Sequence, residues 1–273
     1  MSSDRLTYPI TRTVDQTDDY HGTAVADPYR WLEGGADDQE VQGWIEAQSR
    51  FTADYLEQLP GRDQIQARLT TLWDYEKYGT PFKKSVKTGD GDGDGGDRYF
   101  YFKNDGLQNQ SVLYVLDDLD GEPKELLDPN TLSEDGTVAL SGAAISEDGQ
   151  YLAYGLSQSG SDWQVWKVRE IESGKDLDDE LNWIKFSGAS WDHDSQGFYY
   201  SRYDEPKESE QFEAVNYYQK LYYHRLGTPQ SEDVLIYHRP DQKEWGFSGS
   251  VTEDGKYLII SVWQGTDPKN LLF

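Results

Sequence analysis

Alternating hydrophobic and polar positions recur along most of the chain in units of similar length. The clearest unit is Ser146–Val168, where an acidic-glycine turn precedes a strand over 151–157, and a polar turn separates it from a second strand over 163–168. The same acidic-glycine-aromatic pattern returns about every 50 residues. Its aromatic anchors are Tyr99, Tyr151, Phe198 and Tyr257. A repeat of about 50 residues with about four short strands is typical of a β-propeller blade.

The repeats predict about four such units. The first opens near Tyr78 and is interrupted by a stretch rich in Gly and Asp, and the other three cover about 129–175, 182–223 and 233 onward. The interrupting stretch places Asp90, Asp92 and Asp94 at the spacing that begins a calcium loop. Tyr101 stands where the loop would need a bidentate glutamate, so we predict a solvated hairpin loop and no metal site.

Residues 1–72 follow a helical pattern instead. Asp27 before Pro28 indicates an N-cap and a first-turn proline, and predicts a short helix. A second helix is predicted from the acidic start at 37–40 to Pro60-Gly61, and a third, shorter one follows. The apolar positions at helical spacing are Val41, Trp44, Ile45, Phe51, Tyr55, Leu56, Leu59, Ile65, Leu69 and Leu72. One amphipathic arm cannot bury such a stripe alone, so we expect it to pack on something else.

Composition narrows the classes of partner. The net charge of −26 over 273 residues repels phosphate backbones and anionic lipid, so we expect neither nucleic-acid nor membrane binding. The acidic residues are dispersed through well-patterned elements, and we interpret them as an adaptation to high salt, where screening relieves self-repulsion. The N-terminus has no signal-peptide pattern and no apolar run reaches the length of a membrane span, so the expected compartment is the cytoplasm.

The end of the pattern bears on domain organisation. The last unit stops within a strand at Leu271-Leu272-Phe273, whereas earlier units continue into another hairpin. About four units would leave two open edges if the ring has more blades. We therefore expect the front part of a longer polypeptide, all-β in class. It would comprise a helical N-terminal arm, 1–72, and a partial β-propeller, 73–273, incomplete at its C-terminal end.

No residue pattern within the chain predicts a catalytic centre. A nucleophile elbow needs Gly-x-Ser-x-Gly on a strand-to-helix turn. The two nearest approximations, around Ser157 and Ser248, lack the second glycine and lie in strand patterns. The four histidines have no metal-binding spacing, and the chain has no cysteine, which excludes disulfides and thiolate sites.

Six segments, in chain order, carry a family resemblance: Tyr20–Glu33, Tyr99–Val115, Leu126–Gly142, Ser146–Trp163, Lys185–Ser201 and Gln219–Leu235. They include the motifs DPYRWLE, YFYFKNDGLQNQSVLYV, SEDGQYLAYGLSQSGSDW and KFSGASWDHDSQGFYYS. Together they closely resemble the prolyl oligopeptidases, a family of cytosolic-type serine peptidases. The resemblance covers almost the whole chain from about Tyr8.

The resemblance implies an architecture and an activity. In this family an N-terminal arm packs on an α/β-hydrolase domain whose main part follows a seven-bladed propeller. The Ser, Asp and His of the triad would then lie beyond Phe273, and this chain alone would be inactive. The implied reaction is attack by an activated serine on the carbonyl after proline, without a cofactor or metal. The implied partners are short proline-containing peptides, with the propeller restricting access by size, and the full-length protein would be a monomer.

Few substrate-facing positions of the family fall within this chain. Phe186 matches an aromatic that lines the pocket for the residue two before proline, although it could equally be a core aromatic of a blade. Trp263 stands where the family has an arginine that binds a substrate carbonyl, and Thr266 stands where it has a pocket cysteine. Gln264 could partly replace the arginine, or specificity could be looser.

Two other readings stay open at this point. The chain could be a non-catalytic propeller that serves as a binding scaffold. It could also belong to the related oligopeptidases that prefer basic residues, which share the DPYRWLE-type start. The GLQNQSVLYV and SEDGTVALSG segments resemble the proline-specific branch more closely.

Overall fold

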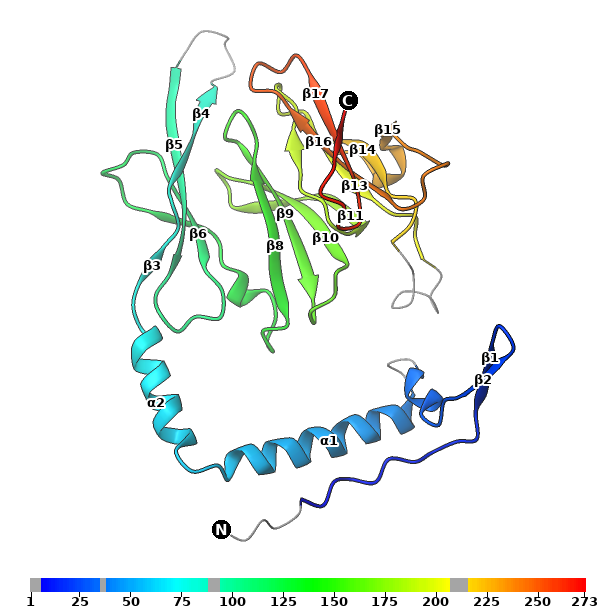
Figure 1. Cartoon of the computed structure of the whole chain (residues 1–273). Coiled ribbons are helices and arrows are strands. Elements are labelled where there is room, and N and C mark those ends of the chain that lie inside the picture. The colour runs from blue at the N-terminus through cyan, green and yellow to red at the C-terminus, as the bar shows by residue number, and fades with distance from the viewer. Residues whose placement is uncertain (1–5, 35–37, 88–93, 207–215) are drawn as a thin grey trace. The chain divides into compact units, whose positions relative to one another are not determined.

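The computed structural model describes residues 6–34, 38–87, 94–206 and 216–273, so the aspartates at 90 and 92 lie outside the described residues. The chain divides into two compact units, Met1–Trp73 and Asp74–Phe273. We call them the N-terminal unit and the β unit, and each is described by itself (Figure 1). No helix in the described ranges is both long and apolar enough to cross a membrane.

The N-terminal unit contains a hairpin, one turn of 3₁₀ helix and two α-helices. In chain order its elements are β1 (Thr17–Tyr20), β2 (Thr23–Ala26), η1 (Arg30–Glu33), α1 (Gln39–Glu57) and α2 (Arg62–Trp73). The predicted second and third helices are confirmed. The predicted short helix begins later than expected, at Arg30, because the Asp27 side chain accepts a hydrogen bond from the Tyr29 amide in a turn that precedes it.

The β1–β2 hairpin was not predicted from the alternation of residues. Its strands pair antiparallel, with Thr17 opposite Ala26 and Tyr20 opposite Thr23. The two turn residues, His21 and Gly22, both have positive φ, 56° and 87°. That backbone matches the type I′ turn that suits the twist of a two-residue hairpin, and glycine adopts it without strain.

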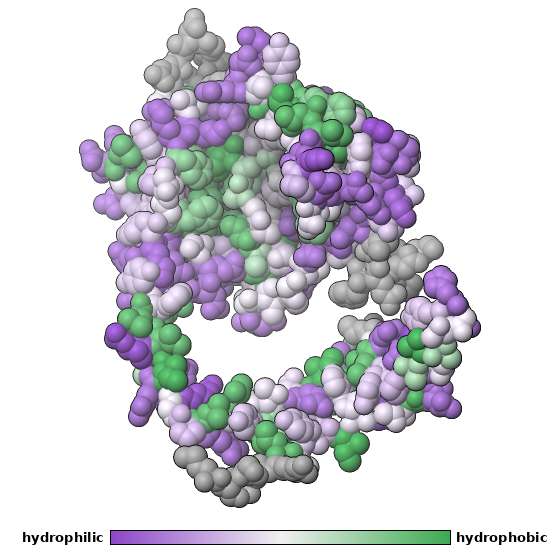
Figure 2. Space-filling model, viewed as in Figure 1, coloured by the Kyte–Doolittle hydropathy of each residue, from purple (hydrophilic) through white to green (hydrophobic). Residues whose placement is uncertain are grey.

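Helix α1 begins where the sequence predicts, because Asp38 caps it: its carboxylate accepts hydrogen bonds from the amides of Glu40 and Val41. Val41 is the only hydrophobic residue of the two α-helices that is buried. The exposed apolar positions along α1 and α2 are Ile45, Tyr55, Leu56, Ile65, Leu69, Leu72 and Trp73. Figure 2 shows green patches along these helices. The unit has secondary structure but little core of its own.

The β unit consists of four antiparallel sheets that follow one another along the chain. The first contains β3 (Lys77–Tyr78), β4 (Phe82–Lys87), β5 (Asp94–Asn104), β6 (Val112–Leu116) and β7 (Lys124–Leu127). The second contains β8 (Val138–Ile145), β9 (Tyr151–Gln158), β10 (Gln164–Glu170) and β11 (Lys175–Ile184). The third contains β12 (Ser190–Trp191), β13 (Gly197–Arg202), β14 (Lys220–Arg225) and β15 (Val234–Tyr237). The fourth contains β16 (Trp245–Val251), β17 (Leu258–Gln264) and β18 (Leu271–Leu272). In the described part of the β unit, the 3₁₀ turns η2 (Pro129–Thr131) and η4 (Gln230–Glu232) lie between strands.

Each sheet is a meander in which consecutive strands pair, as expected of a propeller blade. In the first sheet β3 and β4 pair with successive parts of β5, so they share one strand position. The predicted repeat and the number of units are confirmed. The predicted unit limits are wrong by about ten residues: the second sheet runs over 138–184 rather than 129–175.

The hydrophobic core lies between neighbouring sheets. One cluster joins the first and second sheets around Phe100 and Leu152, a second joins the second and third around Trp166 and Phe198, and a third joins the last two around Phe247. The second and third sheets therefore pack against a neighbour on both faces, and the first and fourth sheets pack against one neighbour each. Stacked repeats make a continuous core in this way.

Polar contacts also cross between sheets. The Trp191 indole donates to the carbonyl of Ala144 at 3.0 Å, and the Ser201 hydroxyl donates to the carbonyl of Phe247 at 2.7 Å. These bonds satisfy groups that the packing of blades removes from water. They also fix the register of one blade on the next.

Candidate functional site

The predicted site residues gather at one edge of the β unit. When β3 and β4 are counted as one strand position, the second strand of every sheet ends at this edge and the third strand begins there. The link from each of the first three sheets to the next sheet also starts at this edge. We call it the site edge. Phe186 lies in the link between β11 and β12, and Thr266 lies in the link between β17 and β18. Antiparallel topology thus brings together residues that are far apart in sequence.

Phe186 is not a core aromatic, because its side chain is 51% exposed. Its backbone is in the left-handed region, with φ of 55°, a conformation that costs free energy in a non-glycine residue. The preceding residue, Lys185, is fixed by hydrogen bonds. Its backbone carbonyl accepts from the side-chain amide nitrogen of Gln219 at 3.0 Å, and the side-chain oxygen of Gln219 accepts from the backbone N–H of Phe247 at 2.7 Å. The aromatic ring is therefore displayed at the site edge on an anchored backbone.

Trp263 lies in β17 and is partly buried. It pairs with Gly246 of β16, and its ring covers that glycine so closely that a Cβ there would lie 2.3 Å from Cε2 of the indole. The glycine is needed for this close approach. The indole at this position packs on its own sheet, and it has no charge with which to bind a carbonyl as a guanidinium would.

Gln264 and Thr266 are brought together. Both line a hollow of about 550 Å³ with Asn216, Tyr217 and Glu244. The Gln264 amide donates to the Glu244 carboxylate at 2.9 Å. Phe186 and Trp263 are not among the lining residues of this hollow in the described part of the chain. Of the four predicted site residues, Gln264 and Thr266 therefore share one hollow, and Phe186 and Trp263 lie outside its lining.

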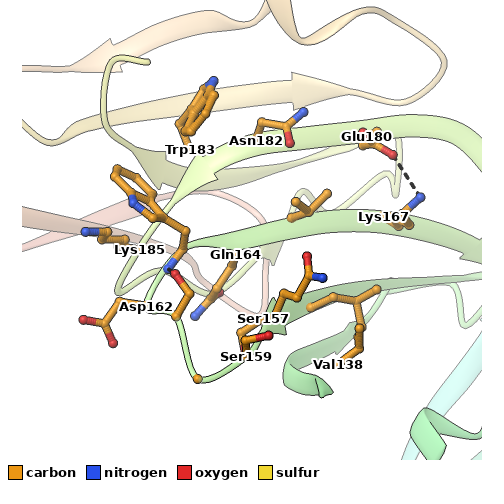
Figure 3. A pocket seen from close by; sticks show the side chains of 16 residues that line it. Val138, Ser157, Ser159, Asp162, Gln164, Lys167, Glu180, Asn182, Trp183 and Lys185 are labelled. Atoms are coloured by element: carbon orange, nitrogen blue, oxygen red, sulfur yellow. Dashed lines mark hydrogen bonds and ion pairs between the residues drawn. The ribbon is translucent and has the colours of Figure 1, made fainter. Parts of the chain in front are cut away.

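A larger hollow at the same edge was missed by the sequence analysis. It measures about 940 Å³ and is lined by the ends of β9 and β11, the start of β10 and the 159–163 turn. Figure 3 shows Trp183 and Lys185 at one end of it, with Asp162 nearby. The indoles of Trp163 and Trp183 meet edge to face, 5.7 Å between centroids. The sequence did contain a signal for this hollow. Trp163 stands directly before the start of one strand and Trp183 near the end of the next, and antiparallel pairing places these two positions at the same edge of the sheet.

Lys185 is the unusual group of this hollow, because it is only 7% exposed. Its ammonium lies 3.2 Å from the side-chain oxygen Oδ1 of Asn216 and 3.9 Å from the centroid of the Trp163 ring. Burial lowers the pKa of Lys185, and the nearby charge of Asp162 only partly opposes that shift. The hollow therefore contains a desolvated cation beside an aromatic wall.

A second buried charged cluster joins the second and third sheets away from these hollows. His224 of β14 is fully buried and contacts two carboxylates: Nδ1 lies 2.7 Å from Asp233, and Nε2 lies 2.9 Å from Asp179 of β11. Asp233 also accepts from the Tyr200 hydroxyl at 2.5 Å. Burial would lower the pKa of His224, but the hydrogen bonds to both aspartates outweigh it and raise the pKa to about 9.

This cluster gives His224 a structural role. Both ring nitrogens are engaged by carboxylates, so the imidazolium joins one blade to the next and has no nitrogen left for a substrate. Asp179 is further satisfied by the amide of Gly227 at 2.7 Å. The sequence analysis did not find this cluster, because its members are 45 and 9 residues apart along the chain.

The two serines that approximate an elbow lie within strands, as predicted: Ser157 in β9 and Ser248 in β16. Neither is on a strand-to-helix turn. In the described ranges, no group of three or more His, Asp or Glu side chains is arranged to hold a metal ion. What this edge offers chemically is binding, through aromatic faces, one buried ammonium and side-chain amides.

Comparison with known proteins identifies the family. Residues 8–273 match the model described as prolyl oligopeptidase, N-terminal beta-propeller domain. The chain is 42% identical over 272 residues to the prolyl endopeptidase of Elizabethkingia miricola, covering 99% of this chain and 36% of that protein. It is 37% identical to prolyl oligopeptidase A of Galerina marginata, covering 97% of this chain and 38% of the relative. The chain thus spans little more than a third of the length of these relatives.

Solved structures agree with this result. Prolyl oligopeptidase B from Galerina marginata, bound to a 35mer hydrolysis and macrocyclization substrate, superposes with a TM-score of 0.79 at 32% identity. The match covers 97% of this chain and 38% of that one. A second structure, from a study of two prolyl endopeptidases, has a TM-score of 0.64 at 39% identity, with 97% and 36% coverage. The four sheets of the β unit are therefore blades of a partial β-propeller.

Proposed function

Because this chain belongs to the prolyl oligopeptidase family, we propose that it is the N-terminal part of a serine endopeptidase that cleaves short peptides after proline. The observation that carries this proposal is the match over residues 8–273 together with 42% identity to a prolyl endopeptidase. Membership of the family supports the coarse part of the proposal, a peptidase activity of the full-length protein. The preference for proline and for short peptides is the finer part of the proposal.

The chemistry would use residues beyond Phe273. A serine hydroxyl, activated by a histidine that an aspartate orients, would attack the carbonyl after proline. This chain would contribute the access route and part of the substrate surface, with Phe186 as an apolar wall near the residue two before proline. It would have no peptidase activity by itself, and it would need no cofactor.

The N-terminal unit supports this arrangement. The apolar side chains of α1 and α2 are exposed, including Ile65 at 62% and Leu69 at 52%. A helical arm with so much exposed apolar surface needs a partner surface. We assign 1–72 to an arm that packs on an α/β-hydrolase domain, and 73–273 to a seven-bladed propeller of which about four blades are present. We expect a cytoplasmic, monomeric full-length protein adapted to high salt.

The test is a measurement on the native polypeptide that carries this sequence. Its intact mass is determined, and it is labelled with a fluorophosphonate probe and assayed with a proline-containing chromogenic peptide. We expect a mass more than double that of this chain, one labelled serine downstream of Phe273, and cleavage after proline. A native mass equal to that of this chain, without label or cleavage, would instead identify a non-catalytic propeller scaffold.

A proline-to-lysine or proline-to-arginine exchange in the same chromogenic peptide distinguishes the remaining alternative. Cleavage of the basic peptides in preference to the proline peptide would assign the protein to the oligopeptidases that prefer basic residues. Hydrolysis by the isolated chain Met1–Phe273 would show that the triad is wrongly placed.

A further inference from the structure

The larger hollow at the site edge contains a buried lysine, Lys185. Lys185 has three N–H donors, of which one reaches the Asn216 side chain at 3.2 Å, while the ammonium also faces the ring of Trp163 at 3.9 Å. A buried ammonium is costly unless it is paired with a counter-charge. The carbonyl and the ring compensate only part of that cost.

Several other partly buried lysines of the β unit have carboxylate partners. Lys84 pairs with Glu147 at 2.6 Å, Lys167 with Glu180 at 2.9 Å, and Lys220 with Asp204 at 2.5 Å. Lys185 is less exposed than any of these, yet it forms no ion pair with a carboxylate of the described residues. The chain has twice as many acidic as basic residues, so this lack of a close partner does not reflect a shortage of carboxylates.

Asp162 is the nearest candidate and does not fill the role. It lines the same hollow, but its side chain is exposed and it acts on Lys185 only through space. Water screens an exposed charge more strongly than a buried one. Among the described residues that line the hollow, Lys185 is therefore a buried charge beside the ring of Trp163, and Asp162 is an exposed one.

The walls of the hollow suit a peptide. Trp163 and Trp183 present indole surface, and the side chains of Gln158, Gln164 and Asn182 supply amide donors and acceptors around it. The volume, about 940 Å³, lies within the range of roughly 300–1,000 Å³ usual for ligand pockets. Trp183 and Phe186 both have positive φ, 61° and 55°, on either side of Lys185. Such backbone persists only where the surroundings fix it, as they do at binding sites.

We propose that this hollow is a peptide subsite in which Lys185 binds a carboxylate, while Trp163 and Trp183 hold a neighbouring apolar side chain. The proposal rests on the proposed function for the identity of the ligand as a peptide. The carboxylate can come from two sources, the C-terminus of the peptide or an acidic side chain. In either case the incoming anion supplies a counter-charge that no described residue provides to Lys185 as an ion pair, and a charge-assisted hydrogen bond in a desolvated hollow is stronger than one in water.

The experiment uses the native polypeptide that carries this chain and two matched pairs of probes. The first pair is acetyl-Gly-Pro-Gly-Phe with a free C-terminal carboxylate and the same peptide as its C-terminal amide. The second pair is acetyl-Gly-Pro-Glu-Phe-amide and acetyl-Gly-Pro-Gln-Phe-amide. Binding is measured by isothermal titration calorimetry with the labelled, inactivated protein, and KM and kcat are measured with the active one.

Three variants separate charge from fold. Lys185→Met removes the charge and keeps most of the stem, and Lys185→Arg keeps the charge. Lys167→Met is the matched control, because Lys167 lines the same hollow but is already paired with Glu180. The unfolding midpoint of each variant is determined. If Lys185→Met does not fold, the two probe pairs measured on the unchanged protein still decide, because equal binding within both pairs contradicts the proposal.

We expect one carboxylate probe to bind about tenfold more tightly than its amide, a difference of about 1.4 kcal/mol at 25 °C. Lys185→Met should abolish that preference, and Lys185→Arg and Lys167→Met should retain it. The pair that shows the preference identifies the source of the carboxylate. Equal binding within both pairs, or equal losses in Lys185→Met and Lys167→Met, would overturn the proposal.

The outcome is distinguishable from failure of the proposed function. If no proline peptide is cleaved but calorimetry shows the carboxylate preference, the subsite stands and the peptidase assignment fails. If the peptides are cleaved without a preference, the peptidase assignment stands and the subsite is wrong.

Discussion

The N-terminal unit and the β unit differ in how much of their apolar side chains they bury. Along α1 and α2 only Val41 is buried, whereas the β unit contains three buried clusters, each shared by two neighbouring sheets. A blade finds its packing partner in the next repeat of the same chain, about 50 residues away. A single amphipathic helical arm has no such repeat beside it. The β unit thus buries apolar side chains within itself, whereas the helices of the arm leave most of theirs exposed.

The largest expected effect on stability comes from removing His224, which connects the second and third blades through Asp179 and Asp233. Replacing His224 with alanine leaves Asp179 and Asp233 buried without their cation, so we expect a loss of about 3–5 kcal/mol of unfolding free energy. Urea unfolding of the variant measures it. His193→Ala, at an exposed position, is the control and should change stability by less than about 0.5 kcal/mol. Similar midpoints for the two variants would show that the cluster does not hold the blades together.

A matched leucine pair tests the comparison directly. Leu221, in the cluster between the last two blades, is fully buried, whereas Leu69 of α2 is 52% exposed. We expect Leu221→Ala to cost about 3–5 kcal/mol, from lost transfer free energy and the remaining cavity. Leu69→Ala should stay within about 0.5 kcal/mol in the isolated chain. If Leu69→Ala were as destabilising as Leu221→Ala, the arm would have a core of its own and the comparison would fail.

The pH dependence of stability tests the contacts of His224 between the second and third blades. The pKa of His224 is raised to about 9 from an ordinary value of 6.5. Its stabilising contribution is therefore complete below about pH 6.5 and is lost as pH rises through 9. We expect the free energy of unfolding to fall by up to about 3 kcal/mol between pH 7 and 9.5. The His224→Ala variant should lack this decline over the same interval, and an identical decline in both proteins would contradict the assignment.

The smallest effect concerns salt, and we expect it in both units because acidic residues occur throughout. The net charge of −26 implies self-repulsion that salt screens. Raising KCl from about 0.1 M towards molar levels should raise the thermal midpoint by a few degrees, the shift that about 1 kcal/mol produces in a chain of this size. A flat or falling midpoint would reject the interpretation as adaptation to high salt. Equal ionic strength supplied as NaCl controls for effects specific to potassium.

Local patterns were enough to predict much of this fold. The aromatic anchors near 50-residue spacing predicted the blades, and the acidic start before Val41 predicted α1, because period and capping are properties of neighbouring residues. The limits of the blades were predicted about ten residues too early. The anchors show the period of the repeat, but which strands share a sheet is decided by hydrogen bonds between segments that the pattern does not register.

The sequence by itself determined the alternation of strands, the helical arm, the acidic net charge and the family resemblance. The first two and the last depend on short segments of neighbouring residues, and the net charge depends on composition alone. Tertiary structure alone decided the sites. It placed His224 between Asp179 and Asp233, gathered Gln264 and Thr266 with Asn216 in one hollow, and left Lys185 buried against Trp163. The physical reason is that burial and charge pairing depend on distances in space, and antiparallel blades bring together side chains that lie tens of residues apart along the chain.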